Sequence, residues 1–213
     1  IERAPPLVSP ELSEEEKRAK IQDIYRRIPE ELIKTHYGLG DVMDDIEDIV
    51  TKILQSDVAG APGSSHIPTL VGPPGAGKTT LLKTLGKLTG RPVYVLSMNM
   101  VSDVADLKGT HKTFLHSKAG LIVATLIEGD PNSPAVGGVS GVKNPIFILD
   151  EIGQADPTVQ SALLGLVGEE SIEFEDNYYG KRPVNGCTFL ATTNYLDTVI
   201  PPLLNRMNII HRP

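Results

Sequence analysis

The stretch Gly72-Pro73-Pro74-Gly75-Ala76-Gly77-Lys78-Thr79-Thr80 decides the fold of this chain. It follows the pattern G-x-x-x-x-G-K-T, whose glycines let a short loop turn so that backbone N–H groups converge on phosphate oxygens. An apolar run, residues 67–71, precedes the loop. Leucines follow it at the spacing of one helical face, namely Leu81, Leu82, Leu85 and Leu88. The strand–loop–helix context that the motif needs is present, so the stretch predicts a nucleotide-binding loop.

The residue types in this loop suit a nucleotide triphosphate with a divalent metal. A helix beginning near Lys78 would add the positive end of its dipole. Lys78 can reach the β- and γ-phosphates, and the Thr79 hydroxyl can ligate Mg²⁺. We therefore expect ATP and Mg²⁺ as ligands, with all nine residues from Gly72 to Thr80 at the nucleotide. The alternative is a Gly/Pro-rich turn, which the complete spacing and both flanks disfavour.

Composition narrows the class of protein. The chain has 213 residues, of which 40% are hydrophobic and 22% charged, enough for a buried core. Its net charge of −7 gives no overall footprint for nucleic acid or an anionic membrane, although a local basic patch remains compatible with it. The single cysteine, Cys187, fits a reducing compartment, either cytoplasm or an organelle matrix. No membrane span or signal peptide is visible. Because the chain begins at Ile1 rather than Met, we expect a fragment of a longer protein.

The chain before the phosphate loop is predicted to be helical. The sequence from Ser13 to Glu16 has the spacing of a capping box, and Pro29 is expected to end that helix or open the next. Asp41 can cap a further amphipathic helix. Residues 56–66 are rich in Gly, Ala, Ser and Pro and read as a linker. We therefore divide the chain into a helical lead-in with linker, 1–60, and a nucleotide-binding core, 61–213.

Apolar runs alternate with helical segments in the core. A strand is predicted at 67–71, where Pro68 suits a strand's start or edge, and strands buried on both faces are predicted at 93–96, 145–149 and 187–191. Helices are predicted at 101–107, 120–127, 157–167 and 202–207, and a hairpin or long loop at 170–185. This alternation predicts an α/β, three-layer P-loop NTPase fold on a mainly parallel sheet, preceded by the N-terminal helical segment.

Two strand ends carry side chains suited to hydrolysis. The strand at 145–149 runs into Asp150-Glu151, where Asp150 would hold Mg²⁺ and Glu151 would polarise the attacking water. Asn194 follows the next strand, and its amide could contact the γ-phosphate or the water. Arg206 could face a neighbouring subunit's γ-phosphate, or be an ordinary surface arginine. The five histidines have no zinc-ligand spacing, so no metal beyond Mg²⁺ is expected.

The order of phosphate loop, Asp-Glu, Thr-Asn and trailing arginine resembles that of AAA+ ATPases. In its detailed sequence, from about His36 to the chain end, the protein resembles the ATPase module of Lon proteases. The matching stretches are His36-Tyr37-Gly38-Leu39, 70–80, Thr89-Gly90-Arg91, Lys108-Gly109, 144–152 and 200–207. The first and last of these are more selective than the phosphate loop, which many families share. The resemblance implies the large AAA+ subdomain.

Several roles are implied by this resemblance. It makes Asn194 the sensor-1 residue and Arg206 the arginine finger, and it puts Tyr37 near the adenine. Phe114-Leu115 occupies the place of the aromatic–aliphatic pair that grips substrate in the axial pore of a ring. Taken without the family, Phe114 is as readily a core aromatic. Because residues 108–119 lack a continuous apolar stripe, we expect Phe114 to be exposed.

The sequence also departs from the family. His116 stands where Gly usually follows the pore pair, Gly153 replaces the last Asp of Asp-Glu-Ile-Asp, and the insertion 130–141 is longer than usual. The small helical subdomain and the protease domain with its Ser–Lys dyad are missing from these residues. We therefore do not expect the chain itself to cut peptides.

The favoured function is the ATP-hydrolysing core of a Lon-like ATP-dependent protease, which as a homo-oligomer, expected to be a hexameric ring, pulls polypeptide through a central pore. The alternative is an AAA+ module that remodels nucleic acid. A local basic loop with Lys108, Lys112 and Lys118 favours that alternative, and the acidic net charge disfavours it. A third reading is an assembly domain with little turnover, which Glu151 and Asn194 disfavour.

Overall fold

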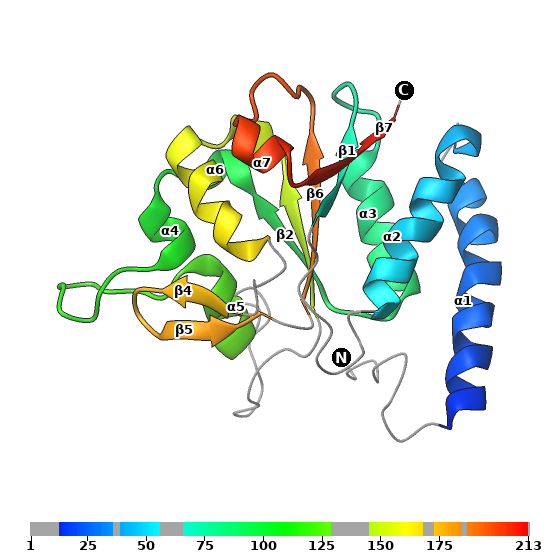
Figure 1. Ribbon diagram of the computed structural model, residues 1–213, viewed down its shortest axis with the longest axis horizontal. Helices are drawn as coiled ribbons and strands as arrows, with labels where there is room; N and C mark the ends of the chain where they lie inside the picture. The colour runs from blue at the N-terminus through cyan, green and yellow to red at the C-terminus, as the bar shows by residue number, and fades with distance from the viewer. Residues whose placement is uncertain are drawn as a thin grey trace.

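A five-stranded parallel sheet forms the centre of the molecule in the computed structural model, which describes residues 13–35, 39–55, 66–128, 145–167, 173–184 and 187–212 (Figure 1). The strand order is β2-β3-β6-β1-β7. The bounds are β1 (Ile67–Val71), β2 (Val93–Ser97), β3 (Ile146–Asp150), β6 (Thr188–Thr193) and β7 (Met207–His211). Val71 pairs with Thr193 and with His211, so the carboxyl ends of β1, β6 and β7 lie level. The predicted parallel α/β fold is confirmed, but β2, predicted to be buried on both faces, is an edge strand and is mostly half-buried.

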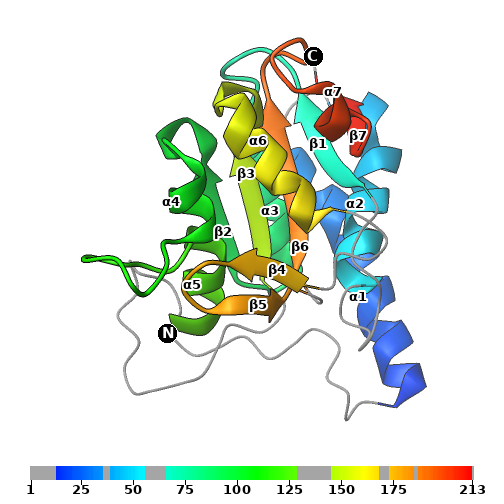
Figure 2. The ribbon, with the colours of Figure 1, turned by 60° about the vertical axis from the view of Figure 1, so that its left-hand side comes forward.

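Helices cover both faces of the sheet, which gives the three layers (Figures 1 and 2). One face packs against α1 (Glu14–Thr35), α2 (Met43–Gln55) and α3 (Lys78–Leu88). The other packs against α4 (Val104–Lys108), α5 (Leu121–Glu128), α6 (Pro157–Leu163), α7 (Pro201–Leu204) and a hairpin of β4 (Glu173–Asp176) and β5 (Gly180–Pro183). Because strand side chains alternate, Ile146 and Ile148 join the first core and Phe147 and Leu149 the second. Short 3₁₀ turns complete the described elements at Gly40–Val42, Met98–Met100, Ile152–Gln154 and Leu164–Leu166.

The N-terminal helices confirm one prediction and correct two. The capping box is present, since the Glu16 N–H donates to Ser13 Oγ at 3.3 Å and the Ser13 N–H donates to Glu16 Oε2 at 2.8 Å. However, α1 continues through Pro29. Buried apolar residues on both sides of the proline pack into the same core, which compensates for one lost backbone hydrogen bond. In addition, α2 begins at Met43, so Asp41 lies within the preceding 3₁₀ turn instead of capping the helix.

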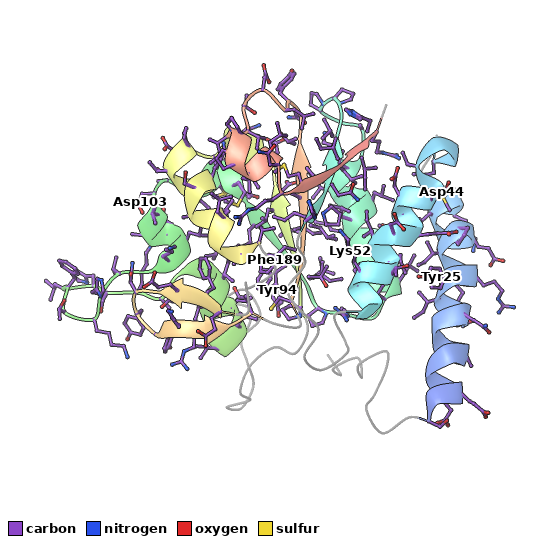
Figure 3. All side chains as sticks on the ribbon, in the orientation of Figure 1. Tyr25, Asp44, Lys52, Tyr94, Asp103 and Phe189 are labelled. Atoms are coloured by element: carbon purple, nitrogen blue, oxygen red, sulfur yellow. The ribbon has the colours of Figure 1, made fainter. Side chains whose placement is uncertain are left out.

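The lead-in helices are held together and share a core with the nucleotide-binding fold. Tyr25 projects from α1 toward α2, where its hydroxyl hydrogen-bonds Thr51 Oγ1 (Figure 3). Ile28 and Leu32 of α1 are buried in the same cluster as Leu81 of α3. Within the described ranges, no helix combines the length and apolar character needed to cross a membrane.

The C-terminal part differs from the prediction at its last elements. The helix expected at 202–207 is the short α7, and Met207 already begins β7, a strand that the sequence pattern missed. The reason is that polar Asn208 and His211 leave β7 with neither a continuous apolar run nor a regular alternation, and the segment takes its conformation from pairing with β1. The expected helix at 157–167 ends at Leu163 and tightens into a 3₁₀ turn. The hairpin expected within 170–185 is present as β4 and β5. Tyr37, residues 56–65 of the linker and the insertion 130–141 lie outside the described residues.

Candidate nucleotide-binding site

The phosphate loop connects β1 to α3 and is shaped by two different constraints on glycine. Gly77 stands directly before α3 with φ of 75°, a conformation that side chains with a Cβ rarely adopt. Gly72 is constrained by space, since a Cβ there would lie 2.1 Å from the carbonyl oxygen of Arg212 at the end of β7. The Arg212 side chain also donates from Nε to the Ala76 carbonyl at 2.6 Å. Arg212, directly after β7, therefore holds the phosphate loop in place.

Lys78 lies buried under the loop with its ammonium surrounded by acceptors. Its Nζ donates to the carbonyls of Gly72 at 2.8 Å and Pro73 at 2.9 Å, and to Asn194 Oδ1 at 2.8 Å. Burial lowers the pKa of the Lys78 ammonium, and the nearby Glu151 and Asp150 carboxylates act in the opposite direction. A desolvated cation held by neutral acceptors can exchange them for phosphate oxygens at the same position.

Asp150, the last residue of β3, accepts two hydroxyl hydrogen bonds on one carboxylate oxygen. Thr79 Oγ1 of α3 donates to Asp150 Oδ1 at 2.5 Å, and Thr192 Oγ1 of β6 donates to the same atom at 2.7 Å. The two residues predicted to ligate Mg²⁺ therefore stand side by side. Within the described ranges, no three His, Cys, Asp or Glu residues gather into a metal-binding group.

Glu151 follows in a left-handed backbone conformation, with φ of 56° and ψ of 49°. A non-glycine residue in this region costs on the order of 1 kcal/mol, and tertiary contacts maintain it. Its N–H donates to Thr192 Oγ1 at 2.9 Å. Its carboxylate accepts from Asn194 Nδ2 at 3.4 Å and from Gln154 Nε2. The turn thus directs the Glu151 carboxylate to the same region as Asn194 and Lys78.

Two contributors to this site had no assigned role in the sequence analysis. Thr192 is fully buried and bridges Asp150 to the Glu151 backbone. A polar residue two positions before Asn194 in an apolar strand was its only signal. The sequence carried no signal for Arg212, because its contact with the phosphate loop depends on the pairing of β7 with β1. The departure at Gly153 also has a structural reason, since a Cβ there would lie 2.2 Å from Thr198 Oγ1.

Arg206 lies apart from these residues, in the turn between α7 and β7. It is exposed, and its Nη1 donates to the carbonyls of Leu164, at 3.1 Å, and Val167. Among the described residues, the Arg206 side chain donates to these carbonyls and not to the phosphate loop of its own chain. Its place outside the site is compatible with action on a neighbouring subunit.

Phe114 and Leu115 are also apart from the site, on a loop that projects from the body between α4 and α5 (Figures 1 and 2). Phe114 is 64% exposed and Leu115 is 89% exposed, so Phe114 is not a core aromatic. His116, which replaces the usual glycine of the family, has φ of 66°. It therefore occupies a left-handed position, in which glycine is the least strained residue.

The parallel sheet, the loop after β1 and the acids after β3 together define a P-loop nucleotide-binding protein. Comparison with known protein families identifies the family within this class. Residues 68–212 match the family described as "ATPase family associated with various cellular activities (AAA)", and the chain belongs to that family.

Similar proteins are Lon proteases. The chain is 34% identical to Lon protease 1 of Syntrophotalea carbinolica, covering 84% of this chain and 21% of that protein. It is 37% identical to a mitochondrial Lon protease homolog of Ostreococcus lucimarinus, covering 85% of this chain and 18% of that protein. It is 33% identical to Lon protease of Escherichia coli strain K12, covering 91% of this chain and 23% of that protein. The chain therefore spans about a fifth of the length of these relatives.

Proposed function

We propose that this chain binds ATP with Mg²⁺ and hydrolyses it as the ATP-driven module of a Lon-like protease. The observation that carries the proposal is the contact network at the carboxyl ends of β1, β3 and β6. Side-chain hydrogen bonds link Lys78 through Asn194 to Glu151 and link Thr79 to Asp150. Thr192 joins the two groups, because its hydroxyl donates to Asp150 and accepts the Glu151 N–H. The similarity to Lon proteases supports the same assignment and favours polypeptide over nucleic acid as the substrate.

In this proposal the loop N–H groups and Lys78 hold the phosphates. Lys78 exchanges the Gly72 and Pro73 carbonyls for β- and γ-phosphate oxygens. Thr79 and Asp150 would hold Mg²⁺, which would supply positive charge to neutralise the phosphates. Two protein oxygens suffice, because Mg²⁺ at such sites takes its other ligands from phosphate and water.

Glu151 acts as the base. It accepts a proton from a water molecule whose oxygen attacks the γ-phosphorus, and the bond to the β–γ bridging oxygen breaks to leave ADP and inorganic phosphate. The Glu151 carboxylate exchanges its bonds to Gln154 and Asn194 for the water. Asn194 then orients the water or the γ-phosphate with its amide.

The ring extends this scheme beyond one chain. Arg206 contributes positive charge to a neighbour's site, and Tyr37 contacts the adenine. Phe114 and Leu115 face the axis of a hexamer and grip polypeptide by apolar contact, which suits unrelated sequences. We place the protein in a reducing compartment, the bacterial cytoplasm or an organelle matrix.

Replacement Glu151→Gln tests the chemistry. It spares Lys78 and Asp150, so ATP binding should be kept, while phosphate release by the ring-forming, full-length protein should fall at least about 100-fold because the base is removed. Glu47→Gln, an exposed residue of α2, is the matched control and should leave turnover unchanged. Near-normal turnover in Glu151→Gln would refute the role.

A further inference from the structure

The exposed loop between α4 and α5, residues 110–118, is closed at its base by two hydrogen bonds. The Thr110 N–H donates to the Lys118 carbonyl at 2.8 Å, and the Lys118 N–H donates to Thr110 Oγ1 at 2.9 Å. Phe114 and Leu115 are near its tip. A loop that is closed in this way can move as a unit, so the contacts beneath its base determine its direction.

Beneath the base, two backbone segments pack with no room for side chains. A Cβ at Gly109 would lie 2.6 Å from the Gly120 nitrogen, and a Cβ at Gly120 would lie 2.2 Å from the Leu107 carbonyl oxygen. Such close packing leaves backbone N–H and C=O groups that need partners. The turn of the β4–β5 hairpin supplies them.

Asp176, at the end of β4, joins the loop to this turn with one carboxylate. It is 1% exposed. Its Oδ2 accepts from the Gly120 N–H at 2.7 Å, and its Oδ1 accepts from the N–H groups of Tyr178 at 2.9 Å and Tyr179 at 2.7 Å. A buried carboxylate with three backbone donors is a strong and directional connection.

Asn177 provides a second connection on the other side of the base. Its N–H donates to the Lys108 carbonyl at 2.6 Å, and its side-chain Nδ2 donates to the Gly109 carbonyl at 3.0 Å. Lys112 of the loop adds a third contact, with its ammonium 4.8 Å from the Tyr178 ring centroid and 5.6 Å from that of Tyr179. The residues that flank the loop at both ends, and Lys112 on its side, are thus attached to the hairpin.

The hairpin is in turn close in sequence to the nucleotide site. The Cys187 N–H, just before β6, donates to the Val184 carbonyl, just after β5, at 3.1 Å. The far end of β6 carries Thr192 and Asn194, which contact Asp150, Glu151 and Lys78. Hydrogen bonds therefore link the base of the exposed loop to the hairpin, and β6, the next strand in the chain, reaches the site.

We propose that Asp176 and Asn177 are positioning residues that make the exposed loop and the β4–β5 hairpin one rigid body, which converts changes at the nucleotide site into movement of Phe114 and Leu115. The statement that the loop transmits changes at the nucleotide site rests on the proposed function. The statement that loop and hairpin form one rigid body does not, because it concerns contacts within one chain. The two parts are tested separately.

Rigidity is measured in this 213-residue chain, which contains no Trp. Leu115→Trp introduces a single reporter at an exposed position, and time-resolved fluorescence anisotropy reports its local motion. Adding Asn177→Ala should increase the amplitude of nanosecond motion, while adding Asn99→Ala, an exposed asparagine of the Met98–Met100 turn, should not. Equal amplitudes in the two double variants would overturn the proposal.

Coupling is measured in the ring-forming, full-length protein as substrate molecules unfolded per ATP hydrolysed. Asn177→Ala should keep the maximal ATPase rate and lower this ratio by about fivefold, the population change expected from one lost hydrogen bond. A purely structural defect would lower ATPase and unfolding together. Asn177→Asp keeps the shape but places an acceptor against the Gly109 carbonyl, so it should lower the ratio at least as much and serves if the alanine variant does not fold.

Phe114→Ala separates the two possible failures. If it leaves unfolding of the substrate intact, the proposed gripping role is wrong. If it abolishes unfolding but both Asn177 variants retain the wild-type ratio, the gripping role stands and the positioning role is overturned.

Discussion

Thr192→Val removes one oxygen atom from the site at nearly constant volume. Thr192 is fully buried, and its hydroxyl donates to Asp150 Oδ1 at 2.7 Å and accepts the Glu151 N–H at 2.9 Å. Asp150 Oδ1 keeps the Thr79 hydroxyl, so the Glu151 N–H is the group left unsatisfied, at a cost of about 1–3 kcal/mol. The lost hydrogen bond to the Asp150 carboxylate adds about 1 kcal/mol. We expect the free energy of unfolding to fall by about 2–4 kcal/mol.

The control is Thr192→Ser, which keeps the hydroxyl and loses only a methyl group, at a cost of about 1 kcal/mol. Urea denaturation of this chain at 25 °C measures both variants. In the ring-forming protein, Thr192→Val should also lower the maximal ATPase rate more than ATP affinity, because the Glu151 backbone loses its restraint while Lys78 is untouched. If the serine variant is less stable than the valine variant, apolar burial outweighs the two hydrogen bonds and the reasoning is wrong.

Two further substitutions test the residues outside the site. Arg206→Ala should lower ATP turnover of the ring by about 10³-fold or more while leaving the nucleotide affinity of the monomeric chain almost unchanged, because the charge acts on a neighbour; a monomer that hydrolyses ATP as fast as the ring would contradict this. Phe114→Ala should change the free energy of unfolding by less than about 0.5 kcal/mol, whereas Phe147→Ala in the core should cost about 3–5 kcal/mol. A comparable loss in both variants would show that Phe114 is a packing residue.

The positions of four strands were predictable because their signal is local. β1, β2, β3 and β6 are short apolar runs next to turn residues, and the phosphate loop identifies the first of them. Burial on both faces was predicted wrongly for β2, because its place at the edge depends on the order of strands in the sheet. β7 was missed because its conformation depends on hydrogen bonds to β1, which its own sequence does not encode. α1 was predicted to stop at Pro29 because the proline rule is local, whereas continuation through it depends on a shared core with α2 and α3.

The sequence by itself determined the residue types and spacing of the phosphate loop, the Asp150-Glu151 pair and Asn194, because each belongs to a short motif at the end of an apolar strand. Only the tertiary structure decided how Thr192, Arg212, Asp176 and Asn177 act. Each has a partner that lies between 41 and 136 positions away in the chain. The physical reason is that a hydrogen bond of this kind depends on which strands and turns the fold brings within about 3 Å of each other, and no local pattern carries that information.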